Sequence, residues 1–332
     1  MVTLKDIADH CDLSISLVSK VLNNRMGTSG AKQHVVESIR KAAQDLGYRK
    51  NLSAQALRSG RHNVIGVMMH HFGRPGTGLV EAMLLGISQA CSDSHQSQTL
   101  TFYQNADEFR ASIKNYHPGT MDGIIIAGLA HPELAEDIRT LVSSHFPIVS
   151  IHPAPIPDLK IPNVGIDETR IAELATTHLL EQGCQNLVYI GNHISERTQG
   201  FIKAMKQHGK TTSDQQIIDC GWSFENAYQA AQQLIASGMT FDGIATECDE
   251  SATGILAALM DHDYKVPQDV RVIGIDNSPY CQFQPVTLSS IGQCPMRRGK
   301  AAVDMLNQII TRQATVASQV FEPELFARNS TR

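Results

Sequence analysis

Residues 3–22 have the sequence TLKDIADHCDLSISLVSKVL and contain two short helical patterns separated by a turn. Thr3 and Asp6 form the [ST]-x-x-[DE] pattern of a helix start, in which both side chains cap free backbone amides. Asp12 tolerates the left-handed backbone of a tight turn, and Ser14 suits the N-cap of a second helix. The apolar residues of that helix, spaced to face inward, are Leu17, Val18, Val21 and Leu22. The pattern therefore predicts a helix, a turn and a second helix.

A third helix is predicted after a loop that contains Gly27, Ser29 and Gly30. Its apolar residues recur at i, i+4, i+7 and i+11, and they are Val35, Ile39, Ala42 and Leu46. Gly47 follows at the position of a helix C-cap glycine. We expect the three helices to enclose one small core.

The first 62 residues differ in charge from the rest of the chain. They contain ten Lys and Arg against five Asp and Glu, a net charge of +5, and the remaining residues contain 18 against 28, a net charge of −10. A basic head on an acidic body favours a head that binds a polyanion and a body with a different task. A solvated basic surface is the alternative interpretation of the same charges.

The second predicted helix carries the candidate contacts to DNA bases. In helix-turn-helix modules this helix enters the major groove, and residues near its N-terminus reach base edges. Ile15 suits contact with a thymine methyl group, Ser16 can bond to either base type, and Lys20 can reach guanine or a phosphate. The alternative is a solvated surface with one exposed isoleucine.

Length and composition limit the class of protein. The 332 residues suggest about two folded units at roughly 150 residues per domain, and 42% hydrophobic with 18% charged residues excludes disordered and fibrous proteins. The longest apolar run, residues 123–130, is far shorter than the ~20 residues of a membrane helix, and the N-terminus lacks the apolar region of a signal peptide. We therefore expect a cytoplasmic protein. Seven scattered cysteines without a CxxC pattern predict reduced, mostly buried thiols rather than disulfides or a zinc site.

From residue 64 onward, apolar runs rich in β-branched residues alternate with segments of helix length. The runs are 64–69, 99–103, 123–127, 147–151, 187–191, 216–220, 243–246 and 270–275. This alternation is typical of βαβ units and parallel sheets, which bind ligands beyond the carboxyl ends of their strands. The predicted fold class is α/β, with a three-helix helix-turn-helix head and a two-lobed sensor built on parallel sheets.

Six short elements follow one another in the N-terminal region: Thr3–Asp9, Leu13-Ser14, Val18–Asn23, Leu46–Tyr48, Asn51 and Ala54–Leu57. In this order they resemble the signature of the lactose/galactose repressor (LacI/GalR-type) family of bacterial transcription regulators. The resemblance implies a helix-turn-helix head, a hinge helix and a periplasmic-binding-protein-like (type I) sugar sensor in a dimer or tetramer. The DNA contacts that it implies, together with the residues singled out above, are Thr3, Ser14, Ile15, Ser16, Ser19, Lys20, Asn23, Asn51, Ala54 and Leu57.

The same resemblance makes Leu57 the hinge leucine that wedges between base pairs in the minor groove, with Ala54 as its small neighbour. Such apolar wedges kink DNA and expose more surface for contact. From the residues alone, 51–57 is only a short linker with helical character. Three departures from the family pattern affect operator sequence and hinge stiffness: Leu17 replaces the usual Thr, the loop after Asn24 is longer, and Lys50 replaces a Pro.

The resemblance continues along the body through Met121–Ile126, Val164–Asp167, His178–Gly183, Arg197–Phe201, Val266-Pro267, Val272–Asn277 and Glu324–Thr331. The effector contacts that it implies are Arg197, Trp222, Asp249, Asp276 and Gln293. Their chemistry suits a polyol, because guanidinium groups donate in a plane, carboxylates accept from hydroxyl groups and an indole packs on a sugar ring. Taken singly, the carboxylates could instead cap helices, the arginine could be solvated and Trp222 could fill the core.

The loop after the first predicted strand supplies three more effector candidates, His70, Phe72 and Arg74. Phe72 suits stacking on a ring, and Arg74 together with Arg197 leaves a sugar acid or sugar phosphate open beside a neutral sugar. His70 and His71 are adjacent, but successive strand residues point to opposite faces and no third ligand is evident. We therefore predict no metal site and no cofactor.

Two other classes of protein are alternatives to a regulator. An enzyme is disfavoured because the chain lacks GxGxxG after a strand, a P-loop, GxSxG and HExxH, and residues 73–78 resemble a phosphate loop without its Gly-Lys-[Ser/Thr] end. A sugar-binding protein without a DNA role is disfavoured by the helix-turn-helix pattern. The sequence thus predicts a ligand-responsive repressor, not an enzyme, that binds roughly palindromic operator DNA as a homodimer and has no membrane partner.

The predicted division has a helix-turn-helix head at 1–47, a hinge helix and linker at 48–62, and an effector-binding domain at 63–332. Within that domain we expect lobe one at 63–162 and 292–321, and lobe two at 163–291 and 322–332.

Overall fold

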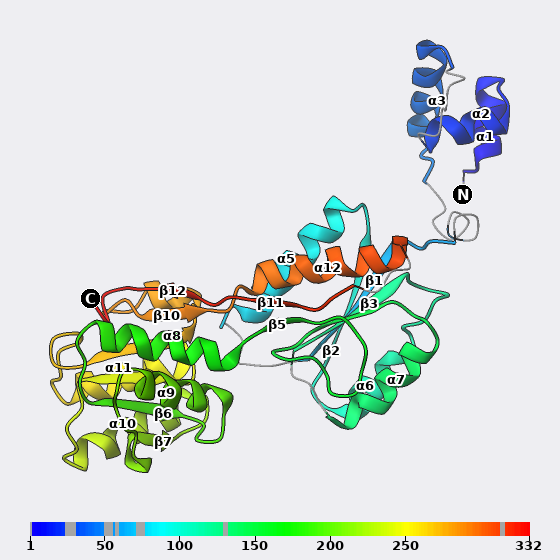
Figure 1. Ribbon diagram of the computed structural model, residues 1–332. Helices are drawn as coiled ribbons and strands as arrows, with labels where there is room; N and C mark the ends of the chain where they lie inside the picture. Colours follow the sequence, from blue (N-terminus) through cyan, green and yellow to red (C-terminus); the bar gives the residue numbers. More distant parts are fainter. Residues whose placement is uncertain are drawn as a thin grey trace. The chain divides into compact units, whose positions relative to one another are not determined.

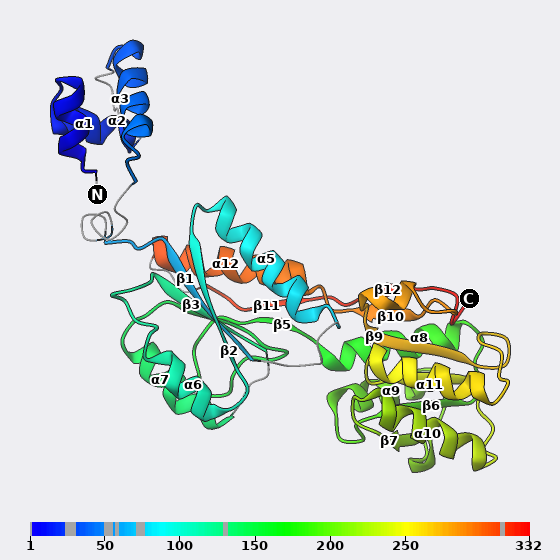
Figure 2. The ribbon, with the colours of Figure 1, turned by 180° about the vertical axis from the view of Figure 1, so that it is seen from behind.

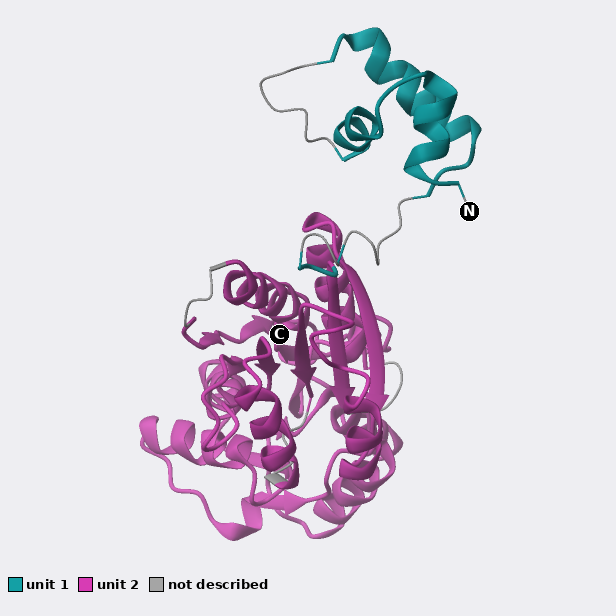
Figure 3. Ribbon diagram, turned by 90° about the vertical axis from the view of Figure 1, so that its right-hand side faces the viewer, with its two compact units in different colours: residues 1–62 teal, residues 63–332 magenta. Residues whose placement is uncertain are grey.

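The computed structural model describes residues 2–23, 31–49, 56, 60–70, 77–128, 132–312 and 316–332. The chain forms two compact units, residues 1–62 and residues 63–332 (Figure 3). Each unit has its own hydrophobic core and is described separately below.

The first unit contains three helices, α1 (Leu4–Cys11), α2 (Ile15–Leu22) and α3 (Gln33–Asp45). Thr3 and Asp6 form the predicted capping box, with the Thr3 amide donating to Asp6 Oδ2 at 2.7 Å and the Asp6 amide donating to Thr3 Oγ1 at 3.3 Å. Asp12 adopts the left-handed conformation at φ 52° and ψ 48°, which turns the chain between α1 and α2. The predicted helix, turn and helix are confirmed.

Each helix of this unit contributes one fully buried residue to a common core: Ile7 from α1, Val18 from α2 and Ile39 from α3. Burial of an Ile or Val side chain contributes about 1.5–3 kcal/mol, so these three contacts fix how the helices pack. Gly47 follows α3 at φ +67°, a conformation that glycine adopts without strain. The predicted C-cap glycine is therefore confirmed.

The second unit contains two main sheets, each covered by helices on both faces (Figure 1). The first sheet is parallel and has the order β2-β1-β3-β4. Its strands are β1 (Val64–His70), β2 (Ser97–Tyr103), β3 (Gly123–Ala127) and β4 (Ile148–Ile151). Its helices are α5 (Leu79–Asp93), α6 (Ala106–Ile113), α7 (Ala135–Ser143) and α12 (Pro295–Arg312), with the 3-10 turn η1 (Pro132–Leu134) before α7.

Side chains of β1 alternate between the two faces of this sheet. Val67 packs in one cluster with Ile87 of α5 and Val303 of α12, whereas Met68 packs in another with residues of α6 and α7. Helices α5 and α12 lie side by side on the first face in both views (Figures 1 and 2).

The second sheet has the order β12-β10-β9-β8-β6-β7, and all its pairings are parallel except that between β12 and β10. Its strands are β6 (Leu187–Gly191), β7 (Ile217–Asp219), β8 (Gly243–Thr246), β9 (Arg271–Asp276), β10 (Ser289–Gly292) and β12 (Glu324–Phe326). Its helices are α8 (Glu168–Glu181), α9 (Glu196–Gln207), α10 (Phe224–Ala236) and α11 (Asp249–Asp261), with short 3-10 turns η2 (Asp214–Gln216) and η3 (Pro279–Gln282). Helices α10 and α11 pack on one face, and α8 and α9 on the other.

The chain passes between the two sheets after β4, after β10 and again after α12. A short parallel pair, β5 (Val164–Ile166) with β11 (Gln319–Phe321), lies along two of these passages (Figures 1 and 2). The α/β class with parallel sheets is confirmed, and all eight predicted strands are present with bounds that differ by at most two residues. The prediction missed the four short strands β5, β10, β11 and β12.

Two further observations concern the whole chain. Five of the seven cysteines are buried, Cys11 and Cys294 are partly exposed, and all seven are free thiols, as predicted. No helix in the described part of the chain combines the length and the apolar character needed to cross a membrane.

Candidate functional site

The surface of α2 presents the first group of candidate residues. Val18 and Val21 are buried and hold one face of α2 against the core, so that Ile15, Ser16 and Lys20 lie exposed on the other. Ile15 is 48% exposed, although a large apolar side chain gains free energy when it is buried. An exposed isoleucine at the first residue of α2 is consistent with contact to another molecule at this end of the helix.

Four other predicted DNA contacts already make hydrogen bonds inside the head. The hydroxyl oxygens of Thr3 and Ser14 accept from the amides of Asp6 and Leu17, so they cap α1 and α2. Asn23 Nδ2 donates to the Ser19 carbonyl at 2.8 Å and to its Oγ at 3.3 Å. The predicted hinge contacts Asn51, Ala54 and Leu57 lie outside the described residues.

A second group of candidates meets at the carboxyl edge of the second sheet. Asp276 ends β9, Gln293 follows β10, and Arg197 lies in the first turn of α9. Gln293 Nε2 donates to Asp276 Oδ1 at 2.6 Å. The structure thus brings three of the implied effector contacts to one edge, because neighbouring parallel strands end together.

Arg197 is held by two acceptors that the sequence did not indicate. Its Nε donates to Glu168 Oε2 at 2.5 Å, and its Nη1 donates to the main-chain carbonyl of Glu247. Side chains of Arg197 and Glu168 are 12% and 14% exposed, so this ion pair is largely shielded from water. The alternative that Arg197 is solvated is therefore wrong.

The charges of this cluster interact strongly. Burial raises the pKa of Asp276 well above its ordinary value, the nearby Arg197 lowers it, and the Asp249 carboxylate raises it further. Burial lowers the pKa of Arg197, but Glu168, Asp276 and Glu247 outweigh that effect and raise it above its ordinary value. A single guanidinium therefore stabilises several carboxylates at this edge.

Asp249 lies beneath this cluster and is fully buried. Its Oδ2 accepts from the Ser278 amide at 2.7 Å, and its Oδ1 accepts from the Ser290 hydroxyl at 2.6 Å. Burial raises its pKa to about 6, against these hydrogen bonds, which lower it. The carboxylate of Asp249 thus connects the start of α11 to β10 and to the segment after β9.

Glu247 supports the loop that leads into α9. Its Oε2 accepts from the Tyr189 hydroxyl at 2.6 Å, the Asn192 amide at 3.0 Å and the Ser195 hydroxyl at 3.3 Å. The sequence does not single out Glu168 or Glu247: Glu168 is a single carboxylate next to Asp167, and Glu247 lies two positions before Asp249. Only the folded chain shows that both contact Arg197.

Trp222 lies in the loop between β7 and α10 and is 59% exposed, so the alternative that it fills the core is wrong. Its main-chain carbonyl accepts a hydrogen bond from the Cys248 thiol at 3.4 Å, next to Asp249. Trp222 therefore presents its indole near the carboxyl edge of the second sheet.

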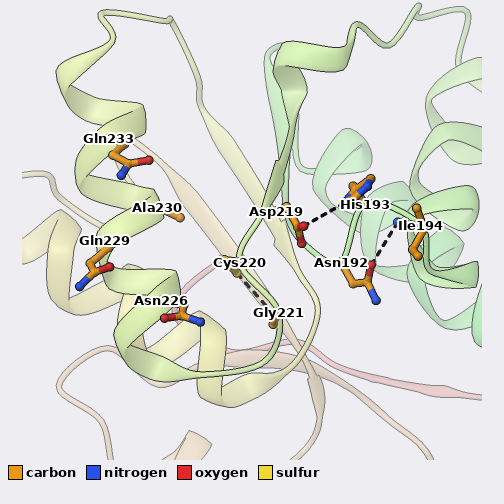
Figure 4. Close-up of a pocket in the computed structure, with 10 residues that line it drawn as sticks. All are labelled: Asn192, His193, Ile194, Asp219, Cys220, Gly221, Asn226, Gln229, Ala230 and Gln233. Atoms are coloured by element: carbon orange, nitrogen blue, oxygen red, sulfur yellow. Dashed lines mark hydrogen bonds and ion pairs between the residues drawn. The ribbon is translucent and has the colours of Figure 1, made fainter.

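An open groove of about 600 Å³ lies beside this edge, between the loops after β6 and β7 and one face of α10 (Figure 4). Its lining consists of Asn192, His193, Ile194, Asp219, Cys220, Gly221, Asn226, Gln229, Ala230 and Gln233. His193 and Asp219 pair across it at 2.9 Å, and the three α10 side chains with polar ends are all amides. The groove is polar, and within the described residues it contains no Lys or Arg.

His70 is placed apart from these residues, at the end of β1 in the first sheet. It is buried, lies 5.4 Å from the Tyr103 ring and has its Nε2 3.3 Å from the Gln104 carbonyl. Phe72 and Arg74, predicted beside it, lie outside the described residues. Within the described part of the chain, no three His, Cys, Asp or Glu side chains are grouped so that they could hold a metal ion.

The sequence of the chain is similar to those of known transcription regulators. A family model described as a periplasmic binding protein-like domain matches residues 176–331. The HTH-type transcriptional repressor PurR of Glaesserella parasuis serovar 5 (strain SH0165) is 24% identical over 351 aligned positions, which cover 100% of this chain and 99% of PurR. The HTH-type transcriptional regulator GalR of Escherichia coli (strain K12) is 24% identical over 339 positions, which cover 99% of this chain and 96% of GalR.

Among solved structures, the Lac repressor dimer bound to operator and the anti-inducer ONPF has a TM-score of 0.82, with 21% identity and 99% of each chain covered. This likeness shows that the two chains share their fold over nearly their whole length.

Proposed function

We propose that the chain is a member of the lactose/galactose repressor family and a sequence-specific transcription repressor whose operator affinity is set by a small sugar or sugar derivative, which the similarity to PurR, GalR and the Lac repressor supports. The observation that carries the proposal is the surface of α2. Two buried valines fix α2 on the head, and the opposite face presents Ile15, Ser16 and Lys20 to solvent. A helix held in this way matches the element that reads the major groove in helix-turn-helix proteins.

We propose the following division of labour along the chain. Residues 1–47 bind operator half-sites, residues 48–62 form a hinge helix and linker, and residues 63–332 bind the effector. Lobe one comprises 63–162 and 292–321, and lobe two comprises 163–291 and 322–332. The separate cores around the two sheets support the assignment of two lobes.

The proposed effector site lies at the carboxyl edges of the sheets, where Arg197, Asp276, Gln293 and Trp222 contact the ligand. The pairing of Gln293 with Asp276 supports this, because amide and carboxylate groups together can accept from and donate to neighbouring hydroxyl groups. His70, Phe72 and Arg74 are proposed to contribute from lobe one. For Asp249 we propose a positioning role, since both its oxygens accept hydrogen bonds from protein groups.

We propose that the active form is a cytoplasmic homodimer on a roughly palindromic operator, without enzymatic activity and without a cofactor or metal. Large apolar side chains are exposed on α5, α12 and β2 of the first sheet, and they include Leu85, Met296, Leu100 and Phe102. A dimer that covers these side chains removes apolar surface from water and pairs two heads with two half-sites.

Selection from fragmented genomic DNA tests the DNA-binding proposal. The purified full-length protein is expected to enrich fragments that share a pseudo-palindromic sequence, and the affinity for that sequence is expected to fall steeply with salt. Random fragments of equal length serve as the control. Enrichment no greater than that of random DNA would overturn the proposal.

A further inference from the structure

We propose that Glu168 makes the effector site selective for an uncharged or cationic ligand group, and that carboxylates and phosphates are excluded at Arg197. The inference rests on the proposed function, because it concerns the ligand of the proposed effector site. Glu168 is thereby assigned as a residue that determines specificity by its charge and by its bond to Arg197.

The first argument is the use of the guanidinium nitrogens. A guanidinium holds a carboxylate or phosphate best through two adjacent nitrogens, either Nε with one Nη or the two Nη together. Glu168 already occupies Nε of Arg197, and the Glu247 carbonyl occupies Nη1. Each of these two pairs of guanidinium nitrogens therefore has one nitrogen that already donates to the protein. An anion must displace a protein acceptor before it can bind to both nitrogens of a pair.

The second argument is the balance of charge around Arg197. The carboxylates of Glu168, Glu247 and Asp276 all interact with its guanidinium, and Asp249 interacts with Asp276. Among the described residues, Arg298 on α12 is a second cation that interacts with Glu168, but it is buried, and its Nη2 donates to the carbonyls of His152 and Val164. The carboxylates of Glu168 and Glu247 alone balance these two cations, so the cluster offers an arriving anion no excess of positive charge.

The third argument concerns what a neutral or cationic group gains at the same place. A hydroxyl group donates to one of these carboxylates and accepts from a nitrogen at no cost in charge. A protonated amine adds a cation beside Asp276, which is partly buried and whose pKa is raised by desolvation and by Asp249. Both kinds of group stabilise the carboxylate cluster, and a carboxylate or phosphate does not.

The groove beside the cluster is also lined by groups that do not favour an anionic ligand (Figure 4). Its polar lining is mainly amides, and His193, its basic group, is paired with Asp219. Ligand groups that extend from Arg197 along the loop after β6 therefore meet amides and a carboxylate rather than Lys or Arg. The sequence allows an anionic effector because of Arg74 and Arg197, but in the structure Glu168 already pairs with Arg197.

Matched ligands that differ only in charge test the proposal. The full-length protein is titrated by calorimetry near neutral pH with two series of ligands. The glucose series consists of glucose, glucosamine, glucuronate and glucose 6-phosphate. The galactose series consists of galactose, galactosamine, galacturonate and galactose 6-phosphate. In the series that binds, the neutral or amine member is expected to bind at least about tenfold more tightly than the acid or the phosphate. Glu168→Gln is expected to reduce that preference about tenfold, because it removes one negative charge and replaces the ion pair at Nε of Arg197 with at most a weaker, neutral hydrogen bond.

Glu181→Gln is the matched control, since it makes the same change at the exposed far end of α8 and is expected to leave the preference unchanged. Tighter binding of an acid or a phosphate to the wild type, or an equal preference in Glu168→Gln and Glu181→Gln, would overturn the proposal. Failure of every neutral and amine compound to bind would also count against it. Operator binding measured without ligand is independent of these outcomes, so loss of the proposed function would be recognised separately.

Discussion

The Ser290 hydroxyl donates a 2.6 Å hydrogen bond to Oδ1 of Asp249, and this bond joins the first residue of α11 to the strand that leads into Gln293. The bond lies under the candidate effector site, so the position of Gln293 and the ionisation of Asp249 are linked through one buried contact. This link gives Asp249 a measurable role in stability.

The stability of the protein is expected to depend on pH through Asp249. Burial raises its pKa in the folded chain to about 6 from an ordinary value of 3.8, so the folded state retains a proton that the unfolded state has lost. The free energy of unfolding therefore falls as pH rises between these values, by an amount on the order of 3 kcal/mol. Asp249→Asn removes this dependence of stability on pH. The difference in Tm between Asp249→Asn and the wild type is therefore expected to increase, in favour of the variant, from about pH 4 to about pH 7. Parallel Tm curves for the two proteins would contradict the assignment.

Arg197→Ala is expected to weaken effector binding. The substitution removes charge-assisted hydrogen bonds worth on the order of 1.5–3 kcal/mol, which is about one to two decades in Kd. Calorimetry with the sugar that most raises the Tm of the wild type gives the measurement. Arg170→Ala, at an exposed arginine on α8, is the control and is expected to leave Kd unchanged. A wild-type Kd for Arg197→Ala would remove Arg197 from the site.

Gly86→Ala is expected to destabilise the first sheet and its helices. A Cβ at Gly86 on α5 would collide with the main-chain carbonyl of Met296 on α12, and backbone cannot move aside as a flexible side chain can. Such overpacking costs about 1–3 kcal/mol, measured as the free energy of unfolding in urea. Ser88→Ala, on the exposed side of the same helix, is expected to change stability by less than about 0.5 kcal/mol. Equal stability of the two variants would show that α5 and α12 separate at little cost.

Ile15→Ala is expected to weaken binding to the selected operator without loosening the head. Loss of an apolar contact to a base costs about 1 kcal/mol, while the number of phosphate contacts and hence the salt dependence stay the same. Fluorescence anisotropy at several salt concentrations separates these two effects. A changed slope with an unchanged sequence preference would assign Ile15 to the backbone of the DNA instead.

Leu57→Ala is expected to reduce DNA bending and to weaken the operator complex. If Leu57 is a wedge, its loss removes the partial unstacking that kinks the duplex. A circular-permutation gel measures the bend, and effector affinity, measured by calorimetry, is the control that should stay constant. Equal bending by the variant and the wild type would exclude the wedge.

Local patterns in the sequence were sufficient for the head and for the longer strands. Thr3, Asp6, Asp12 and Gly47 act on backbone atoms within a few residues of themselves, so their roles are visible in the sequence. The eight predicted strands have apolar runs long enough to stand out from their surroundings. These features predict the α/β class and the helix-turn-helix head.

Features that depend on contacts between residues far apart in the chain could not be predicted from the sequence. The missed strands are three or four residues long, and β10 contains two buried serines: Ser289 bonds to the C-terminal segment, and Ser290 bonds to Asp249. Glu168 and Arg197 are 29 residues apart in sequence, and their pairing depends on the packing of α8 against α9. The family resemblance predicts that Asp249 contacts the ligand, and nothing in its local sequence reveals that Ser278 and Ser290 donate to its carboxylate.

The repeated passage of the chain between the two sheets has a consequence during synthesis on the ribosome. Strands β1 to β4 emerge early, but α12, which covers one face of their sheet, begins only at Pro295. The edge strand β12, which completes the second sheet, is translated later still. At about 5–20 residues per second, the segment between β4 and α12 takes about 7–30 s to translate, and during this time the α5 side of the nascent first sheet is only half covered and exposes apolar surface that chaperones can bind.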